Sequence, residues 1–140
     1  GSVEVKEGEI IIDALFGSGL NRPLQGFIAT LITFLNGKKA SRIAIDIPSG
    51  LTADLTQNTF QGPIFEADYT LTFQLPKISF LFPEAYKYTG EIEVLDIGLD
   101  RSFNKSISNS SYWIDRESVK LLVKKRKKFD HKGTFGHGLL

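Results

Sequence analysis

A chain of 140 residues with 41% hydrophobic residues is long enough to bury the core of one globular domain. It has no cysteine, which excludes a disulfide framework, a thiolate metal site and a cysteine nucleophile. Residues 1–119 carry 10 Lys and Arg against 15 Asp and Glu, whereas residues 120–140 carry 7 Lys and Arg against 1 Asp. The basic charge is therefore confined to one short segment next to an acidic body, which argues against nucleic acid as a partner.

The first predicted element is a strand. Residues 10–16 form a short, continuous apolar run, which is typical of a strand buried on both faces of a parallel sheet. Asp13 lies late in this run. Open α/β sheets bind ligands beyond the carboxyl ends of their strands, so we expect Asp13 near such a site.

A glycine-containing loop follows, made of Gly17, Ser18, Gly19, Leu20, Asn21, Arg22 and Pro23. Its glycines let a ligand approach the backbone closely, and a helix starting after it would offer free N–H groups to a phosphate. Arg22 adds a donor for a charge-assisted hydrogen bond. The alternative is an ordinary strand-to-helix turn, because Gly-x-Gly alone is a weak signal.

Apolar residues at helical spacing predict a helix over residues 24–35, with Pro23 in its first turn and Gly37 just past its end. Residues 42–47 then predict a second strand. A strand, a helix and a strand in this order are typical of a right-handed βαβ unit on a parallel sheet.

Two polar residues close the second strand. Asp46 is its last polar group, and Ser49 follows in the turn Pro48-Ser49-Gly50. A carboxylate in the crevice beyond a strand end is suited to acid–base catalysis. The alternative is structural: Asp46 caps the turn and Ser49 supplies a turn hydroxyl.

Residues 68–73 and 91–97 predict the third and fourth strands, and the prolines between them leave room for at most a short helix. Lys77 follows the third strand and could hold an anion. Taken alone, a solvated surface lysine is the more common interpretation.

The last part of the chain predicts little regular structure. Residues 102–111 predict a loop, a helix is expected from an N-cap at Asp115 to about residue 125, and residues 124–132 predict a linker. Residues 135–140 resemble the start of a strand. The two histidines, His131 and His137, match no metal-binding spacing, and the chain has no Gly-x-Ser-x-Gly or Walker loop, so metal hydrolysis and triad chemistry have no support.

The predicted fold class is α/β, a Rossmann-like three-layer parallel sheet, incomplete and corresponding to the second half of a domain. Four strands with one long helix would leave one sheet face largely bare, and the strand and Gly-rich turn that normally open such a domain are not in the sequence. No apolar run approaches the roughly 20 residues that a membrane helix needs.

The strings Asp-Ala-Leu-Phe-Gly-Ser-Gly-Leu-Asn-Arg-Pro at residues 13–23 and Ala-Ile-Asp-Ile-Pro-Ser-Gly-Leu at residues 44–51 resemble the NAD(P)H-hydrate epimerase family, also called the YjeF N-terminal domain. The stretches around residues 67–77 and 90–99 resemble its closing strands, in the right order. The resemblance covers roughly residues 5–100, and the two motifs together are specific to this family.

Residues 129–138 resemble the entry into the ADP- or ATP-dependent NAD(P)H-hydrate dehydratase, a ribokinase-like domain. The resemblance therefore implies three parts: the second half of an epimerase domain at 1–112, a helix and basic linker at 113–130, and the start of the dehydratase domain at 131–140. We expect both neighbouring parts, the remaining half of the epimerase domain and the dehydratase domain, in the parent polypeptide.

The family interconverts the R and S forms of hydrated NADH and NADPH, so that an S-specific dehydratase can restore the cofactor. The resemblance implies that Asp13 and Ser49 bind potassium, that residues 17–23 and Asp46 contact the dinucleotide, and that Asp46 is the catalytic group. ADP or ATP would serve the dehydratase domain alone. We expect a cytoplasmic homo-oligomer with no nucleic-acid or membrane partner.

The family's Asn-Asn-Gly-Gly-Asp-Gly loop, which supplies further ligand contacts, is not in this sequence, so we expect little epimerase activity from the chain alone. One alternative is a non-catalytic binding or scaffold module that keeps a Rossmann-like frame. The other is a generic nucleotide-binding Rossmann enzyme, although the usual Gly-x-Gly-x-x-Gly is not present. The joint presence of Asp13, Asp46 and Ser49 favours the epimerase.

Overall fold

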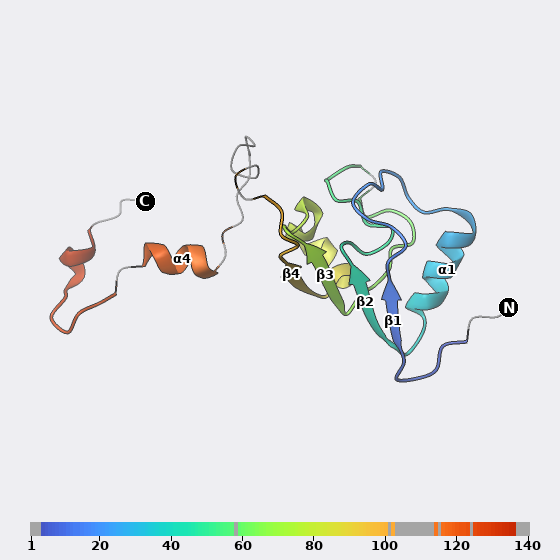
Figure 1. The fold of residues 1–140 in the computed structure, drawn as a ribbon, viewed down its shortest axis with the longest axis horizontal. Coiled ribbons are helices and arrows are strands. Elements are labelled where there is room, and N and C mark those ends of the chain that lie inside the picture. Colours follow the sequence, from blue (N-terminus) through green and yellow to red (C-terminus); the bar gives the residue numbers. More distant parts are fainter. Residues whose placement is uncertain are drawn as a thin grey trace. The chain divides into compact units, whose positions relative to one another are not determined.

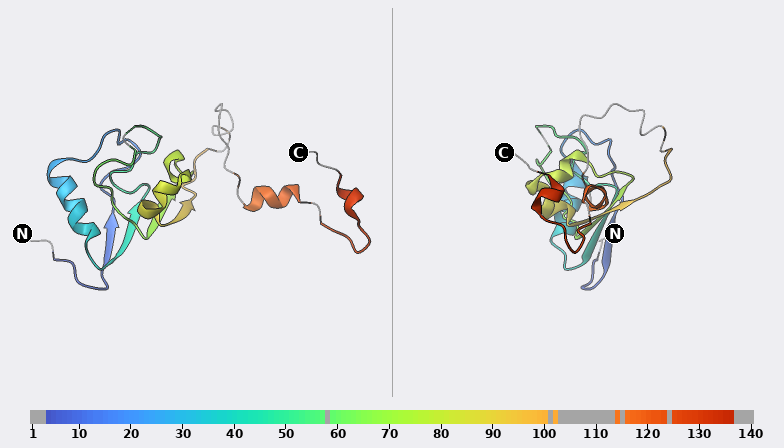
Figure 2. Two further views of the ribbon diagram at one scale, coloured as in Figure 1. Left: turned by 180° about the vertical axis from the view of Figure 1, so that it is seen from behind. Right: turned by 90° about the vertical axis from the view of Figure 1, so that its left-hand side faces the viewer.

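The computed structural model describes residues 4–57, 59–100, 102, 114, 116–123 and 125–136. The chain forms two compact units, residues 1–100 and residues 101–140. The first unit contains all four strands of a parallel sheet together with α1 and α2, and the second contains α4 (Figures 1 and 2).

All four predicted strands form, and the α/β class is confirmed. The strands run in the order β1-β2-β3-β4, and each pairs with the next in parallel; they are β1 (Ile10–Asp13), β2 (Ser41–Ile45), β3 (Tyr69–Phe73) and β4 (Glu91–Leu95). β1, β2 and β4 end two or three residues earlier than predicted. The apolar runs therefore continue past the ladder into the loops at the carboxyl edge.

The long helix α1 spans Gly26–Asn36, with Gly37 as its C-cap. Its end is as predicted, but its start is not, because Pro23 lies outside the first turn. Gln25 is extended and Gly26 has a φ of +60°, a left-handed conformation that a helix interior does not allow. Leu24 instead packs into the core as a loop residue.

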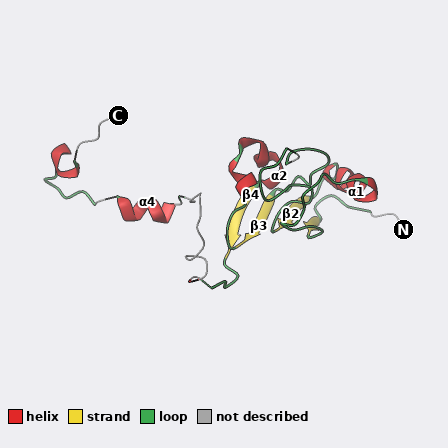
Figure 3. Ribbon diagram, turned by 90° about the horizontal axis from the view of Figure 1, so that it is seen from above, coloured by secondary structure: helices red, strands yellow, loops and turns green. Residues whose placement is uncertain are grey.

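Short helical pieces connect β3 to β4, as predicted: two 3₁₀ turns, Ile78–Leu81 and Pro83–Ala85, and the four-residue helix α2 (Tyr86–Thr89). Figure 3 shows α1 and α2 on the same side of the sheet. This follows from the strand order, because successive right-handed crossovers that all step in one direction place their connections on one face.

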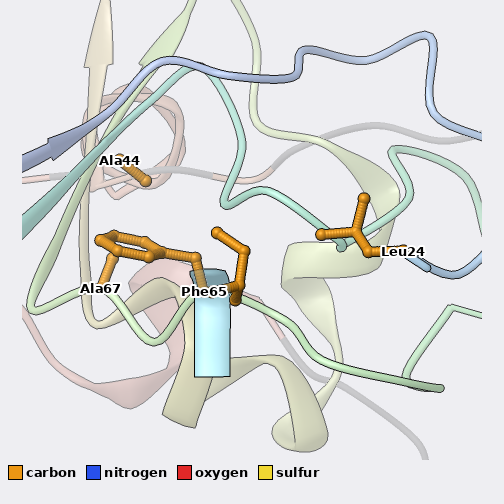
Figure 4. Close-up of a cluster of buried hydrophobic side chains, with 5 residues drawn as sticks. Leu24, Ala44, Phe65 and Ala67 are labelled. Atoms are coloured by element: carbon orange, nitrogen blue, oxygen red, sulfur yellow. The ribbon is translucent and has the colours of Figure 1, made fainter. Parts of the chain in front are cut away.

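The core lies between that face and its helices. One cluster joins α1 to β2 and the segment before β3, and it contains Leu24, Ile32, Ala44, Phe65 and Ala67 (Figure 4). A second cluster lies under the loops that follow β2 and β3, and it contains Ile47, Leu51, Ile64, Phe80 and Tyr88. The first cluster packs α1 against the sheet, and the second packs the loops that follow β2 and β3 on one another.

The opposite face of the sheet is bare among the described residues, as predicted. Ile10, Ile12 and Tyr69 share this face by register and are 62%, 64% and 54% exposed. The prediction that the first strand is buried on both faces is therefore wrong for β1. The described residues form two layers, a sheet and one layer of helices, which is consistent with the incomplete three-layer α/β fold that the sequence predicted.

The second unit contains α4 (Arg116–Leu122), which confirms the predicted helix, and a 3₁₀ turn at Lys132–Phe135. The turn contradicts the expected strand at Phe135. The N-cap prediction at Asp115, most of the loop predicted over 102–111, and residues 137–140 lie outside the described residues. In the described part of the chain, no helix has the length and apolarity to cross a membrane.

Candidate functional site

Asp13 and Ser49 meet at the carboxyl edge of the sheet, as the sequence predicted for residues that follow neighbouring strands. Asp13 ends β1 and is 3% exposed, and Ser49 lies in the turn after β2 and is fully buried. The Ser49 hydroxyl donates to Oδ1 of Asp13 at 2.6 Å, and the Ser49 N–H donates to Oδ2 at 2.7 Å. The contact ties two adjacent strand ends together and places a carboxylate and a hydroxyl side by side.

Asp46 occupies an unusual backbone position directly after β2. Its φ is +67°, and the N–H of Ile47 donates to the carbonyl of Ile45 at 2.9 Å across it. A three-residue turn with a positive central φ is the rarer and strained form of γ-turn. Aspartate tolerates this conformation better than most residues, which is consistent with its presence here.

The same turn recurs at the end of the neighbouring strand. Gln74 follows β3 with a φ of +61°, and the N–H of Leu75 donates to the carbonyl of Phe73 at 2.7 Å. Two adjacent parallel strands therefore leave the sheet through matching strained turns. Strain of this kind concentrates at functional sites, where the surrounding structure holds it in place.

Lys77 and Asp46 form an ion pair between these two turns. Nζ of Lys77 lies 2.7 Å from Oδ1 of Asp46, and the side chains are 15% and 17% exposed. The N–H of Phe73 also donates to Oδ1, at 3.3 Å. Lys77 is thus neither a solvated surface lysine nor a free anchor for an outside anion, because the anion it holds belongs to the protein.

The loop of residues 17–23 lies beside Asp46. An ideal Cβ on Gly17 would be 3.7 Å from Oδ2 of Asp46, so this glycine faces the second carboxylate oxygen. A depression of about 390 Å³ follows the loop, lined by Leu15, Phe16, Gly17, Gly19, Leu20, Asn21 and Arg22. Ser18 is exposed and is not among these lining residues.

A second depression of about 280 Å³ joins this loop to the start of α1, with Arg22, Pro23 and Gln25 among its lining residues. Since α1 begins only at Gly26, the chain does not pass directly from the glycines into a helix N-terminus. The predicted phosphate-binding site therefore differs from expectation in one respect. The backbone N–H groups of residues 17–23 belong to a loop and not to a helix N-terminus, and Arg22 is the cation near the start of α1.

The site residues at the carboxyl edge of the sheet, Asp13, Asp46 and Ser49, offer oxygen atoms as ligands. In the part of the chain that the structure describes, no group of three or more His, Cys, Asp or Glu could hold a metal. His131 accepts a hydrogen bond from the N–H of Gly133 within its own 3₁₀ turn, and His137 lies outside the described residues. Sequence reasoning did not predict the Asp46–Lys77 pair. Its one available signal is that both residues closely follow the ends of consecutive strands.

Comparison with known proteins gives a consistent result. The family model described as "YjeF-related protein N-terminus" matches residues 2–79. A bifunctional NAD(P)H-hydrate repair enzyme Nnr from Coxiella burnetii is 34% identical over 134 residues, which are 96% of this chain and 27% of the relative.

Shorter relatives match a shorter stretch. NAD(P)H-hydrate epimerases from Rhodopirellula baltica and Lentilactobacillus buchneri are 42% and 45% identical, each over 91 residues, which are 65% of this chain. These residues are 36% and 41% of the relatives' lengths. The chain thus spans about a quarter to two fifths of the curated relatives that it matches.

Proposed function

Because this chain belongs to the family of YjeF-related protein N-termini, we propose that its carboxyl edge binds hydrated NADH or NADPH and takes part in interconverting their R and S forms. The relatives are named for epimerisation and repair of NAD(P)H hydrates. The observation that carries the proposal is the placement of Asp46, a paired carboxylate on a strained turn, next to the Gly17 loop.

In this proposal Asp46 is the catalytic residue. Its Oδ2 faces the loop that would hold the dinucleotide, so a hydroxyl on the nicotinamide ring could exchange a proton with it. Acid–base catalysis requires such a group within hydrogen-bonding reach of the proton that it moves. Gly17, which faces this oxygen, also lines the depression beside the loop.

Residues 17–23 would contact the substrate through backbone N–H groups and through Arg22. The lining of the two depressions includes every residue of this loop except Ser18. Arg22 can donate two hydrogen bonds at once to a phosphate, a geometry that suits the pyrophosphate of a dinucleotide.

Asp13 and Ser49 fit potassium in donor chemistry, because they present a carboxylate and a hydroxyl together at a buried position. Alkali cations are held by several oxygen atoms that replace their water. When bound there, potassium would supply a fixed positive charge at the edge where the substrate's phosphates would lie. The same two residues also brace β1 against the turn after β2.

We further propose the division into an epimerase part (1–112), a helix and basic linker (113–130) and the beginning of a dehydratase part (131–140). The epimerase from Rhodopirellula baltica matches 91 residues of this chain and the bifunctional enzyme 134, and the longer match to the bifunctional enzyme supports this division. ADP or ATP would act in the dehydratase part alone. The cytoplasmic location and the homo-oligomeric state remain predictions.

The test is direct. The complete natural polypeptide is incubated with the isolated R form of hydrated NADPH, and the appearance of the S form is followed by chromatography, with potassium present. We expect conversion well above the rate of a sample without protein. Conversion equal to that blank at high protein concentration would refute the proposed function.

A further inference from the structure

Asp46 holds its two carboxylate oxygens in different surroundings. Oδ1 accepts from Nζ of Lys77 at 2.7 Å and from the N–H of Phe73 at 3.3 Å. Oδ2 faces Gly17, and among the described residues it has no hydrogen-bond partner. One oxygen is therefore anchored to the protein, and the other faces Gly17 in the loop of residues 17–23.

We propose that Lys77 is a positioning residue that clamps Oδ1 of Asp46, so that Oδ2 alone exchanges the proton with the substrate. This inference rests on the proposed function and adds a residue and a division of labour to it. Lys77 acts through Asp46 and does not itself contact the substrate.

The hydrogen bonds of the lysine support this role. An ammonium has three N–H donors. Nζ of Lys77 reaches three acceptors, which are Oδ1 of Asp46 and the carbonyl oxygens of Phe73 and Leu75, the last two at 3.4 Å. With all three donors engaged inside the protein, Lys77 is fixed in one place and has none left for a substrate phosphate.

The backbone supports the same role. If β2 and β3 continued as a regular parallel ladder, the N–H of Phe73 would donate to the backbone carbonyl of Asp46, just as the N–H of Asp46 donates to the carbonyl of Leu71; β2 ends before this point, in the γ-turn at Asp46. Oδ1 takes the place of the lost acceptor. The second γ-turn, at Gln74, redirects the chain so that Lys77 reaches back to the same oxygen. Two strained turns are thus arranged around one carboxylate oxygen.

The two strained turns have a physical rationale, because they pre-organise the Asp46 carboxylate for catalysis. A carboxylate free to rotate would present either oxygen to the substrate, and misplacement of a reacting group by about 1 Å can cost on the order of 10²-fold in rate. An anchored Oδ1 keeps Oδ2 facing the loop of residues 17–23 before the substrate arrives. The loss of Lys77 should therefore lower turnover more than it weakens binding.

The experiment uses the complete natural polypeptide and four proteins: unsubstituted, Lys77→Ala, Lys77→Arg and Lys39→Ala. Lys39 is an exposed lysine just before β2 and serves as the matched control. Epimerisation of R-hydrated NADPH gives kcat and KM, and urea unfolding reports the integrity of the fold. Each assay is repeated with added propylamine, which can supply an ammonium in the space that alanine leaves.

We expect Lys77→Ala to lower kcat by about 10²-fold with KM changed less than about threefold. Lys77→Arg should keep more of the activity, propylamine should restore part of it to Lys77→Ala alone, and Lys39→Ala should match the unsubstituted protein. A purely structural lysine would not give amine rescue with the unfolding midpoint unchanged.

Three outcomes overturn the inference. Normal kcat in Lys77→Ala would do so while leaving the proposed function intact. A loss of activity that follows a lowered unfolding midpoint and resists both arginine and propylamine would show that Lys77 only holds the fold. No turnover in the unsubstituted protein would refute both the proposed function and this role of Lys77.

Discussion

β2 and β3 carry an ion pair at each end, and the two pairs are built differently. At the amino end, Arg42 lies 3.6 Å from Asp68, whose side chain is 44% exposed. At the carboxyl end, Lys77 lies 2.7 Å from Asp46, and both side chains are less than a fifth exposed. The same two strands thus carry one long ion pair with a solvent-exposed carboxylate and one short ion pair that is largely shielded from solvent.

The backbone shows what each pair does. At the amino end neither Arg42 nor Asp68 has a positive φ; the N–H of Asp68 donates to the carbonyl of Arg42, and the N–H of Arg42 donates to the Asp68 carboxylate. At the carboxyl end both strands leave the ladder through strained turns. We interpret the Arg42–Asp68 pair as a structural brace, because it joins unstrained backbone. We interpret the Asp46–Lys77 pair as part of a functional site, because strained backbone concentrates where side chains must be held in one orientation. This difference separates two ion pairs that look alike in a list of contacts.

The largest effect that we expect comes from Asp46→Asn, which tests the carboxyl end. Asparagine keeps the size and the tolerance for positive φ, and its oxygen can still accept from Lys77, but it has lost its acid–base capacity. Turnover should fall by about 10²- to 10⁴-fold. Steady-state epimerisation kinetics and an unfolding curve on the same sample measure it. Near-normal turnover would remove Asp46 from the catalytic role.

The next effect is on stability and comes from the amino end. Gly90 has a φ of +55°, and an ideal Cβ there would lie 2.1 Å from the carbonyl oxygen of Asp68. Gly90→Ala should cost roughly 2–5 kcal/mol, from the left-handed backbone and from forced packing. Urea unfolding measures it, with Gly17→Ala as the control because its added methyl meets only ordinary contact at 3.7 Å. Equal midpoints for the two variants would contradict the close approach.

Much of the fold could be predicted from the sequence because the strands are short, continuous apolar runs closed by glycine or proline. The apolar runs could not show which face of the sheet is covered by helices. Ile10 and Ile12 belong to an apolar run typical of a fully buried strand, yet they are exposed. The direction of the crossovers decides which face receives helices, and no local pattern records it.

The site was predictable only in part, for the same reason. Asp13 and Ser49 were expected at one edge because each follows a strand, and they do meet. The pairing of Lys77 with Asp46 depends on the register between β2 and β3 and on two γ-turns, which no residue type signals by itself. The late start of α1 likewise depends on the conformation of Gly26.

Asp13→Ala should have a smaller effect, divided between stability and binding. It leaves the buried N–H and hydroxyl of Ser49 without their acceptor, which should cost about 1–3 kcal/mol. In the complete polypeptide it should also raise KM and blunt the response to potassium, because it removes the one full negative charge of the proposed cation site. Kinetics with potassium titrated against a bulky inert cation would show this. An unchanged potassium response would move the cation site elsewhere.

The smallest effect should come from Asp68→Asn, the counterpart of Asp46→Asn at the other end of the same strands. Asp68 is nearly half exposed, and its ion pair with Arg42 is long, so solvent screens most of the attraction. An asparagine oxygen can still accept the Arg42 N–H that Asp68 now accepts at 2.7 Å. We expect a loss of about 0.2–1 kcal/mol in urea unfolding and no change in kcat or KM. Both asparagine variants replace one carboxylate oxygen with an amide nitrogen, and the two positions lie at opposite ends of the same pair of strands. If Asp68→Asn lowered kcat as much as Asp46→Asn does, loss of either ion pair would act through the fold of the sheet, and the distinction between brace and site would fail.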